Sequence, residues 1–131
     1  MPQFDQTDLQ QTFHRATDVF NSGNYEHLRP LLHSNITCKM LHHAGSFTSL
    51  DDVIGWLKGT KASLLPQFFP DAGKLITTSA NTGDGSRRIR GPARWQAQSG
   101  GVSENIEYIF TFTTDHDGRW LLINAFGHIT D

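Results

Sequence analysis

The sequence contains a single cysteine, Cys38, so no disulfide can form within one chain. This cysteine stands in an apolar-rich run, which favours a buried, unreactive thiol. No apolar stretch approaches the roughly 20 residues that a membrane-spanning helix needs. Asp5, Asp8 and Asp18 interrupt the first twenty residues, a pattern unlike that of a signal peptide. We therefore expect a cytoplasmic protein without membrane segments.

An excess of basic charge is lacking as well. The formal net charge is -2 at pH 7, whereas nucleic-acid-binding domains usually carry a basic excess, so we expect no nucleic-acid partner. The arginines of the run RRIR, residues 87–90, indicate a solvated strand end paired with nearby carboxylates. Histidines with metal-ligand spacing on a helix are lacking, and no carboxylate stands at a matching offset from His42 and His43. We expect no metal and no cofactor.

The composition that remains is typical of a globular domain. The chain has 131 residues, of which 37% are apolar and 18% are charged. A domain of this size buries roughly two thirds of the surface that its unfolded chain exposes. Neither a repeat nor a linker divides the sequence, so we expect one domain, residues 1–131, with a core that can contain a pocket.

Three helical patterns occupy the first half of the chain. The segment TDLQQTFHRATDVFNSG predicts a helix with one apolar stripe, formed by Leu9, Phe13, Ala16 and Phe20. A shorter helix is predicted over NYEHLRPLLHSN, and a third begins near Ser49, which stands three residues before Asp52 with the spacing of a helix cap. Between them, ITCKMLHH alternates with period two and predicts a strand.

The second half of the chain predicts strands separated by turns. The candidate strands are KLITTSANTG, RRIRGPARWQAQ, ENIEYIFTFT and RWLLINAFGHIT, whereas LLPQFFPDAG is predicted to be a loop. Short turns between consecutive strands indicate an antiparallel meander. Three N-terminal helices that close a strongly curved antiparallel sheet form an α+β cone, and the concave interior of such a cone is a natural ligand site.

Alternation along the strands predicts which side chains face that interior. The expected inner residues are Ile36, Cys38, Met40, His42, Trp95, Ile106, Tyr108, Phe110 and Phe112. The interior would be apolar and aromatic, with His42, Tyr108 and the indole N–H of Trp95 as its polar groups. This chemistry favours a small apolar or aromatic ligand held by stacking and one or two hydrogen bonds.

The placement of two adjacent histidines has more than one solution. His42 and His43 face opposite sides of a regular strand, unless a bulge before Gly45 brings both of them inward. His42 is either a structural histidine or an acid/base group of the pocket.

The closing strand also has two possible registers. A two-residue turn at positions 117–118 places Ile123 and Ala125 on the inner face, with Asn124 and His128 outside. A change of one residue in the turn reverses this and makes Asn124 and His128 ligand-binding residues.

The outer face of the sheet is expected to be covered. In the first register it carries Ile109, Leu122 and Phe126 beside polar groups, which is more apolar surface than a single chain leaves in water comfortably. We therefore expect a homodimer that pairs through the sheet. Phe68 and Phe69, which lie between two prolines, are either core residues or a lip over the pocket mouth.

Three phrases resemble the SnoaL-like branch of the nuclear transport factor 2 and ketosteroid isomerase superfamily. They are GNYEHLRPLLHSNITC after the first helix, HHAGSFTSLDDVIGWL before the third, and DGRWLLINAFGHITD at the closing strand. The resemblance implies a cystatin-like cone with a deep pocket, in a superfamily whose members are commonly dimers. These members include isomerases, polyketide cyclases, dehydratases, epoxide hydrolases and non-catalytic modules.

The catalytic residues of two of these activities have no counterpart here. The first helix lacks the tyrosine of ketosteroid isomerases, and no strand interior offers the Asp-Arg-Asp arrangement of the related epoxide hydrolases. Dehydratase-type sites, which combine histidines, tyrosines and an acid, are closer to the residues available.

Two functions follow from these patterns. The first is a cofactor-independent isomerase, cyclase or dehydratase for a small cyclic or polyketide-like molecule, with His42 as acid/base group and Tyr108 as donor to a developing oxyanion. The second is a non-catalytic ligand-binding or dimerisation module, which is favoured by the lack of an inward carboxylate.

Overall fold

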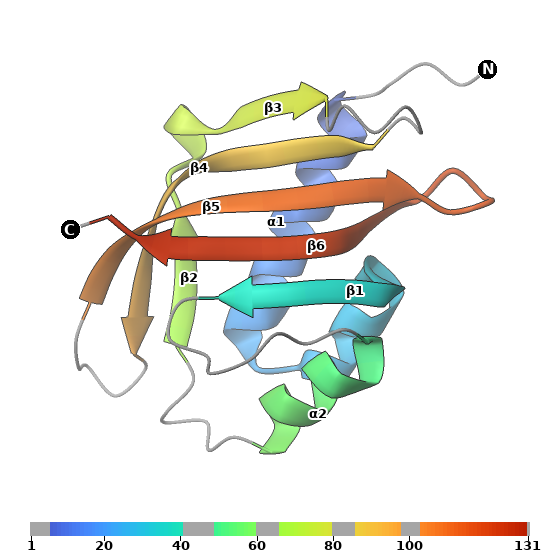
Figure 1. The fold of residues 1–131 in the computed structure, drawn as a ribbon, viewed down its shortest axis with the longest axis horizontal. Coiled ribbons are helices and arrows are strands. Elements are labelled where there is room, and N and C mark those ends of the chain that lie inside the picture. The colour runs from blue at the N-terminus through green and yellow to red at the C-terminus, as the bar shows by residue number, and fades with distance from the viewer. Residues whose placement is uncertain (1–5, 41–48, 60–65, 80–85, 98–102, 131) are drawn as a thin grey trace.

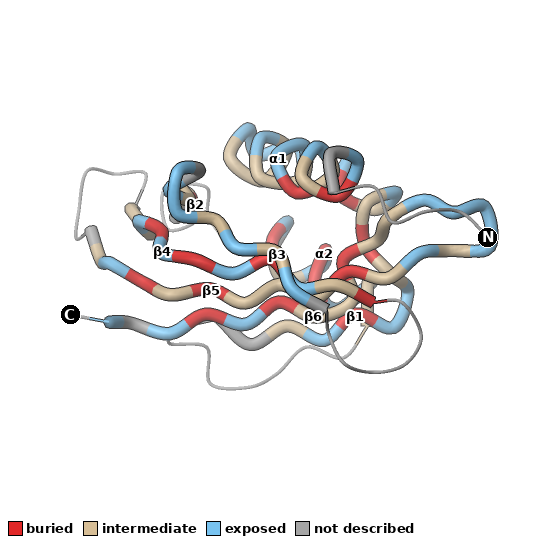
Figure 2. Tube along the Cα trace, turned by 90° about the horizontal axis from the view of Figure 1, so that it is seen from above, coloured by how far each residue is buried: buried red, intermediate tan, exposed pale blue. Residues whose placement is uncertain are grey.

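Helix α1 (Gln6–Ser22) lies across one face of a curved sheet, which forms the second layer of the molecule (Figure 1, Figure 2). The structure is a computed structural model that describes residues 6–40, 49–59, 66–79, 86–97 and 103–130. The 3₁₀ helix η1 (Tyr25–Leu31) and helix α2 (Leu50–Gly59) pack beside strand β1 at one edge of the sheet. Helices on one face of a sheet confirm the α+β class.

Six strands form the sheet. They are β1 (Leu32–Met40), β2 (Pro66–Pro70), β3 (Ile76–Ser79), β4 (Arg87–Ala97), β5 (Ser103–Thr114) and β6 (Trp120–Ile129). Their order is β1-β6-β5-β4-β2, with β3 also paired to β4. The sheet is mixed rather than wholly antiparallel, because β1 runs parallel to β6. No hairpin joins these two strands, so no turn fixes their relative direction.

The predicted helices form, and their apolar residues pack against the sheet or a neighbouring helix. Leu9 and Phe13 on α1 are buried, and Gly23 ends the helix with a φ of +84°, a conformation that costs glycine little. η1 contains Pro30, which lacks an N–H group and is compatible with a short 3₁₀ segment rather than a longer α-helix. At the start of α2, the hydroxyl of Ser49 accepts a hydrogen bond from the backbone N–H of Asp52 at 3.2 Å, which confirms the predicted cap.

The segment predicted to be a loop contains strand β2 instead. β2 pairs with the second half of β4, and β3 pairs with the first half, so one long strand has two partners along the same edge. Pro66 and Pro70 bound β2 at the edge of the sheet, where the missing N–H group of proline breaks no ladder. In the sequence the two prolines indicate a loop. An edge strand can nevertheless contain them, which is why the predicted loop is a strand in the structure.

The β5–β6 hairpin contains two register changes that compensate for each other. Its turn is a three-residue loop, residues 116–118, closed by a hydrogen bond from the Asp115 N–H to the Arg119 carbonyl at 2.9 Å. The predicted two-residue turn is therefore wrong. A bulge follows, because Phe112 pairs with Leu122 whereas Thr111 pairs with Asn124. Beyond the bulge, the register is again the one that a two-residue turn would give.

This bulge decides which residues of β6 face the helices. Leu122, predicted to lie on the outer face, is buried on the inner face, and Ile123 is the extra residue of the bulge. Ala125 is buried opposite Phe110, as the first register predicts. The outward orientation of Asn124 in that register is also observed, because its partner Thr111 alternates with inward Phe110 and Phe112.

A single side chain joins α1 to strand β2. The carboxamide of Asn21 donates to the Phe68 carbonyl and accepts from the Phe68 N–H, both at 2.8 Å. The side chain of Gln67 adds a hydrogen bond to the Asn21 carbonyl at 3.3 Å. Asn21 thus replaces the neighbouring strand that β2 lacks on its free edge, and it holds the end of the sheet against the helix.

We predict that Asn21→Ala destabilises the protein by about 1–3 kcal/mol, because it leaves the backbone donor and acceptor of Phe68 without partners. Urea unfolding measures the change. Asn24→Ala is the matched control, since the Asn24 side chain is exposed and forms no cap hydrogen bond. Equal losses in the two variants would contradict the assigned role of Asn21.

Candidate functional site

A cavity of about 110 Å³ lies between the inner face of the sheet and the helices. Each of the main elements except β3 contributes to its wall. The lining residues are Phe13, Ala16, Thr17, Phe20, Leu28, Leu32, Ile36, Cys38, Val53, Trp56, Leu57, Phe68, Trp95, Phe110, Phe112, Leu122 and Ala125. The cavity therefore occupies the interior of the cone, where the sequence predicts a pocket.

Aromatic rings from the sheet form one side of the cavity. Trp95, Phe110 and Phe112 line it, in agreement with the alternation along β4 and β5. The Phe110 ring stacks on Phe68 with centroids 5.5 Å apart, and the indole of Trp95 lies 6.0 Å from the ring of Phe20 on α1. Phe68 is buried and belongs to the core, whereas Phe69 is exposed on the outer face. These contacts fix the rings in place, so the wall is preformed.

Strand β1, at the other edge of the same sheet, also lines the cavity. Ile36 and Cys38 line the cavity, as alternation along this strand predicts. Burial raises the pKa of the Cys38 thiol to about 11, so the thiol is neutral at physiological pH. Met40 is the last residue of β1. The predicted site residue His42 and its neighbour His43 lie outside the described residues.

Tyr108 is fully buried but does not line the cavity. Its ring stacks on Phe13 with centroids 5.5 Å apart, and its hydroxyl points to the region of Gly91, where a Cβ atom would lie 3.4 Å from it. No residue accepts a hydrogen bond from this hydroxyl among those that the structure describes. Burial and the negative charge of Asp71 raise the pKa of Tyr108, so the phenol stays neutral. Tyr108 supports the cavity through Phe13, which does line it.

Asn124 and His128 lie on the outer face of the sheet. The Asn124 amide donates to the Thr37 hydroxyl at 2.6 Å, which ties β6 to β1 on that face. His128 is exposed, pairs with Glu107 across the strands, and has its ring centroid 5.8 Å from that of Phe126. The structure therefore brings Trp95, Phe110 and Phe112 together around the cavity and places Asn124 and His128 on the other side of the sheet.

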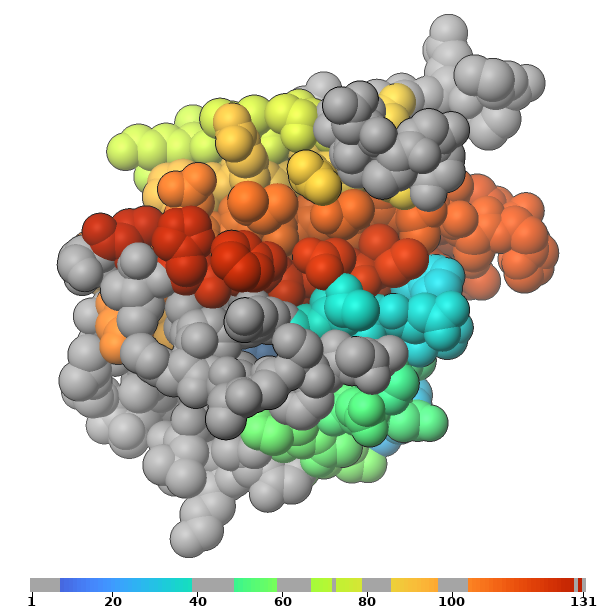
Figure 3. Space-filling view, viewed as in Figure 1, coloured from blue at the N-terminus to red at the C-terminus, as the bar shows by residue number. Residues whose placement is uncertain are grey.

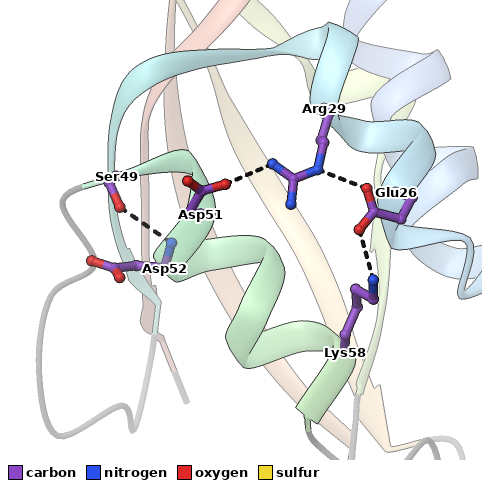
Figure 4. Close-up of polar contacts among 6 residues, drawn as sticks. All are labelled: Glu26, Arg29, Ser49, Asp51, Asp52 and Lys58. Carbon is purple, nitrogen blue, oxygen red and sulfur yellow. Dashed lines mark hydrogen bonds and ion pairs between the residues drawn. The ribbon is translucent and has the colours of Figure 1, made fainter.

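Ion pairs hold the α2 wall of the cavity against η1 (Figure 4). Arg29 contacts Glu26 at 2.7 Å and Asp51 at 2.8 Å, and Lys58 contacts the second oxygen of Glu26 at 2.7 Å. The hydrogen bond from Arg29, followed by that from Lys58, lowers the pKa of Glu26 to about 2. Since the folded-state pKa is lowered, this support is present above the ordinary glutamate pKa and is lost as the pH falls towards 2.

The cavity offers almost no charge to a ligand. None of the residues that line it in the described part of the chain is a carboxylate, an imidazole or a basic group. The hydroxyl of Thr17 already donates to the Phe13 carbonyl at 3.0 Å, and the Cys38 thiol is neutral. Over the described ranges, no three side chains of the His, Cys, Asp and Glu types meet in a way that could hold a metal ion. Such a wall accommodates neutral apolar molecules and excludes ions.

Comparison with solved structures identifies the fold. Nuclear transport factor 2 from Cryptosporidium parvum superposes with a TM-score of 0.72 at 14% identity, covering 98% of this chain and 96% of that chain. An NTF2-like protein with a cystatin-like fold from Novosphingobium aromaticivorans gives 0.71 at 15% identity, covering 97% and 82%. A protein from Shewanella frigidimarina, provisionally assigned as a ketosteroid isomerase, gives 0.72 at 15%, covering 93% and 95%. No family model and no curated protein matches the sequence.

The chain therefore has the NTF2-like, cystatin-like cone fold. The resemblance that the sequence shows to this superfamily is confirmed at the level of the fold. No helix within the described ranges is long and apolar enough to cross a membrane.

The sequence predicts Phe68 as a core or lip residue but not the strand that holds it, although an aromatic residue between two prolines also fits an edge strand. Asn21 was missed because an asparagine near Gly23 at a helix end resembles an ordinary capping residue. Its partner lies 47 residues away in the chain, and no local pattern reveals such a contact.

Proposed function

We propose that the cavity binds a small, uncharged apolar or aromatic ring compound. The observation that carries this proposal is the wall of the cavity, which consists of aromatic and aliphatic side chains with no charged group among the described residues. A volume of about 110 Å³ is somewhat below the ~150 Å³ of an engineered apolar cavity that binds benzene. The size favours one ring over two, with Trp95, Phe110 and Phe112 as stacking partners.

We expect benzene and cyclohexanone to bind. Naphthalene should bind much more weakly, because its second ring exceeds the volume of the cavity. Ala16→Leu fills the cavity from α1 and should weaken benzene binding at least about tenfold, a loss of ~1.4 kcal/mol. The fluorescence of Trp56 and Trp95, which both line the cavity, reports binding.

Thr12→Leu is the matched control for this test, since it adds the same side chain one turn earlier on α1, outside the cavity lining. Unchanged affinity in the Ala16 variant, or equal losses in both variants, would refute binding in this cavity.

Catalysis by His42 is the second candidate function. The alternation of Ile36 and Cys38, which line the cavity, extends in the sequence through Met40 to His42. An imidazole at that position supplies the titratable group that the described wall lacks, and proton transfer by such a group accelerates a reaction typically 10²–10⁴-fold. The reaction class is a cofactor-independent isomerisation, cyclisation or dehydration of a small cyclic or polyketide-like molecule.

A panel of enolisable ketones and hydroxylated aromatics tests this second candidate. His42→Ala should lower turnover by about 10²-fold or more. Tyr108→Phe should leave turnover unchanged and the protein at least as stable, because the Tyr108 hydroxyl is buried without a described partner and lies outside the cavity lining. Turnover that survives in the His42 variant would rule out acid/base catalysis by this residue.

We also propose that the protein forms a homodimer through the outer face of the sheet. Figure 3 shows that side chains of β3, β4, β5, β6 and β1 form this surface without cover from α1 or α2. Ile76, Arg90, Ile109 and Phe126 are consecutive partners in one row across four strands. Ile76 is 49% exposed and Phe126 37% exposed, so the row leaves two large apolar side chains in water, with Arg90 and Ile109 between them.

Light scattering at micromolar concentration should give twice the mass of one chain for the wild type and the mass of one chain for Phe126→Asp. An isologous contact contains residue 126 of both chains. Phe126→Asp would therefore bury two carboxylates in the interface, at a cost of several kcal/mol. His14→Asp on the exposed face of α1 is the control and should remain dimeric. A wild type with the mass of a single chain would overturn the proposed assembly.

A further inference from the structure

A second pocket, of about 400 Å³, opens at the end of the sheet where β2 pairs with β4. It is lined by Phe69, Asp71, Pro92, Ala93, Arg94, Gln96, Asn105, Ile106 and Thr130. None of these residues lines the apolar cavity, and the volume falls within the ~300–1,000 Å³ range of small-molecule sites. The two pockets are therefore separate.

Two residues of opposite charge, Arg94 and Asp71, line this pocket. Arg94 pairs across the strands with Phe69, and the Asp71 N–H donates to the Pro92 carbonyl at 3.0 Å. The two charged residues thus sit two strand positions apart, about 7 Å along the sheet. No ion pair joins them, and neither forms one with another residue in the described ranges.

The carboxylate is held in place although it lacks a cationic partner. One oxygen of Asp71 accepts a hydrogen bond from the Gly73 N–H at 3.1 Å, as the cap of the 3₁₀ turn η3 (Ala72–Lys74). Among the described residues, none donates to the other oxygen, which is therefore available to a ligand. The pocket thus has the fixed carboxylate of Asp71 at one end and the flexible guanidinium of Arg94 at the other. This arrangement suits a ligand that carries one positive and one negative charge.

An apolar surface completes the pocket. The side chain of Phe69 is 44% exposed, which is unusual for a phenylalanine, and it lies directly beside Arg94 in the strand register. Pro92 adds a second apolar surface, and Gln96 and Thr130 provide neutral polar groups at the margin. A ligand with an apolar group next to its charged groups would cover Phe69 while its carboxylate meets the arginine.

We propose that this pocket binds a zwitterion with an apolar side chain, of the type of a free α-amino acid. Arg94 receives the carboxylate in a charge-assisted, bidentate hydrogen bond, and Asp71 receives the ammonium group. The side chain of the ligand packs on Phe69. A ligand with only one charge leaves the opposite protein charge partly desolvated and without a partner, so the site selects for both charges at once.

Three probes of the same shape test the proposal by NMR titration: L-phenylalanine, 3-phenylpropionate, which lacks the ammonium group, and 2-phenylethylamine, which lacks the carboxylate. L-phenylalanine should bind at least about tenfold more tightly than either analogue, with shifts centred on Phe69, Arg94 and Thr130. Equal affinity for the three probes, or no binding of L-phenylalanine, overturns the proposal.

Matched variants locate the binding. Arg94→Gln and Asp71→Asn should each weaken L-phenylalanine binding about tenfold or more, and asparagine keeps the acceptor that caps η3. Arg88→Gln removes the same charge from the same face of β4, outside the pocket, and should leave the affinity unchanged. An equal loss in the Arg88 variant would indicate non-specific attraction and refute the site.

Discussion

The clamp between Asn21 and Phe68 is the contact on which the cavity depends. A sheet edge exposes backbone donors and acceptors, and β2 has β4 on one side only. The Asn21 carboxamide supplies both missing partners at the one residue of β2 whose ring enters the core. Asn21 thus joins the end of the sheet to α1, and Phe68 lines the cavity beside Trp95. Without the hydrogen bonds between Asn21 and Phe68, we expect the cavity between α1 and the sheet to collapse or to open to water.

Much of the site could be predicted because the side-chain period of a strand is two. In β4 and β5, polar residues alternate with Trp95, Phe110 and Phe112, and one face of each strand is buried. The same rule places Ile36 and Cys38 on the wall formed by β1. Where one face of a long strand is apolar, the pattern leaves a single solution, and no knowledge of the neighbouring strands is needed.

The features that could not be predicted depend on contacts between distant segments. The bulge at Ile123 compensates for a longer turn, and only the pairing with β5 reveals either change. β2 is bounded by prolines that indicate a loop unless the strand is known to lie at an edge. The parallel pairing of β1 with β6 follows from the order of strands in space, which no turn in the sequence determines. In each case the local pattern is compatible with several structures, and tertiary packing selects one.

The sheet separates two kinds of chemistry. Around the cavity its inner face offers rings, aliphatic groups and a neutral thiol, whereas Arg94 and Asp71, which form no ion pair with any described residue, lie at the far end of the sheet. Burial explains the division, since a charge in the interior would lose several kcal/mol of hydration without a partner to offset it. A reaction inside the cone that moves a proton therefore needs a titratable group at the margin of the cavity, where water still reaches it. Our proposal that His42 is the acid/base group answers this requirement, since Ile36 and Cys38 of β1 line the cavity and the sequence continues from that strand to His42.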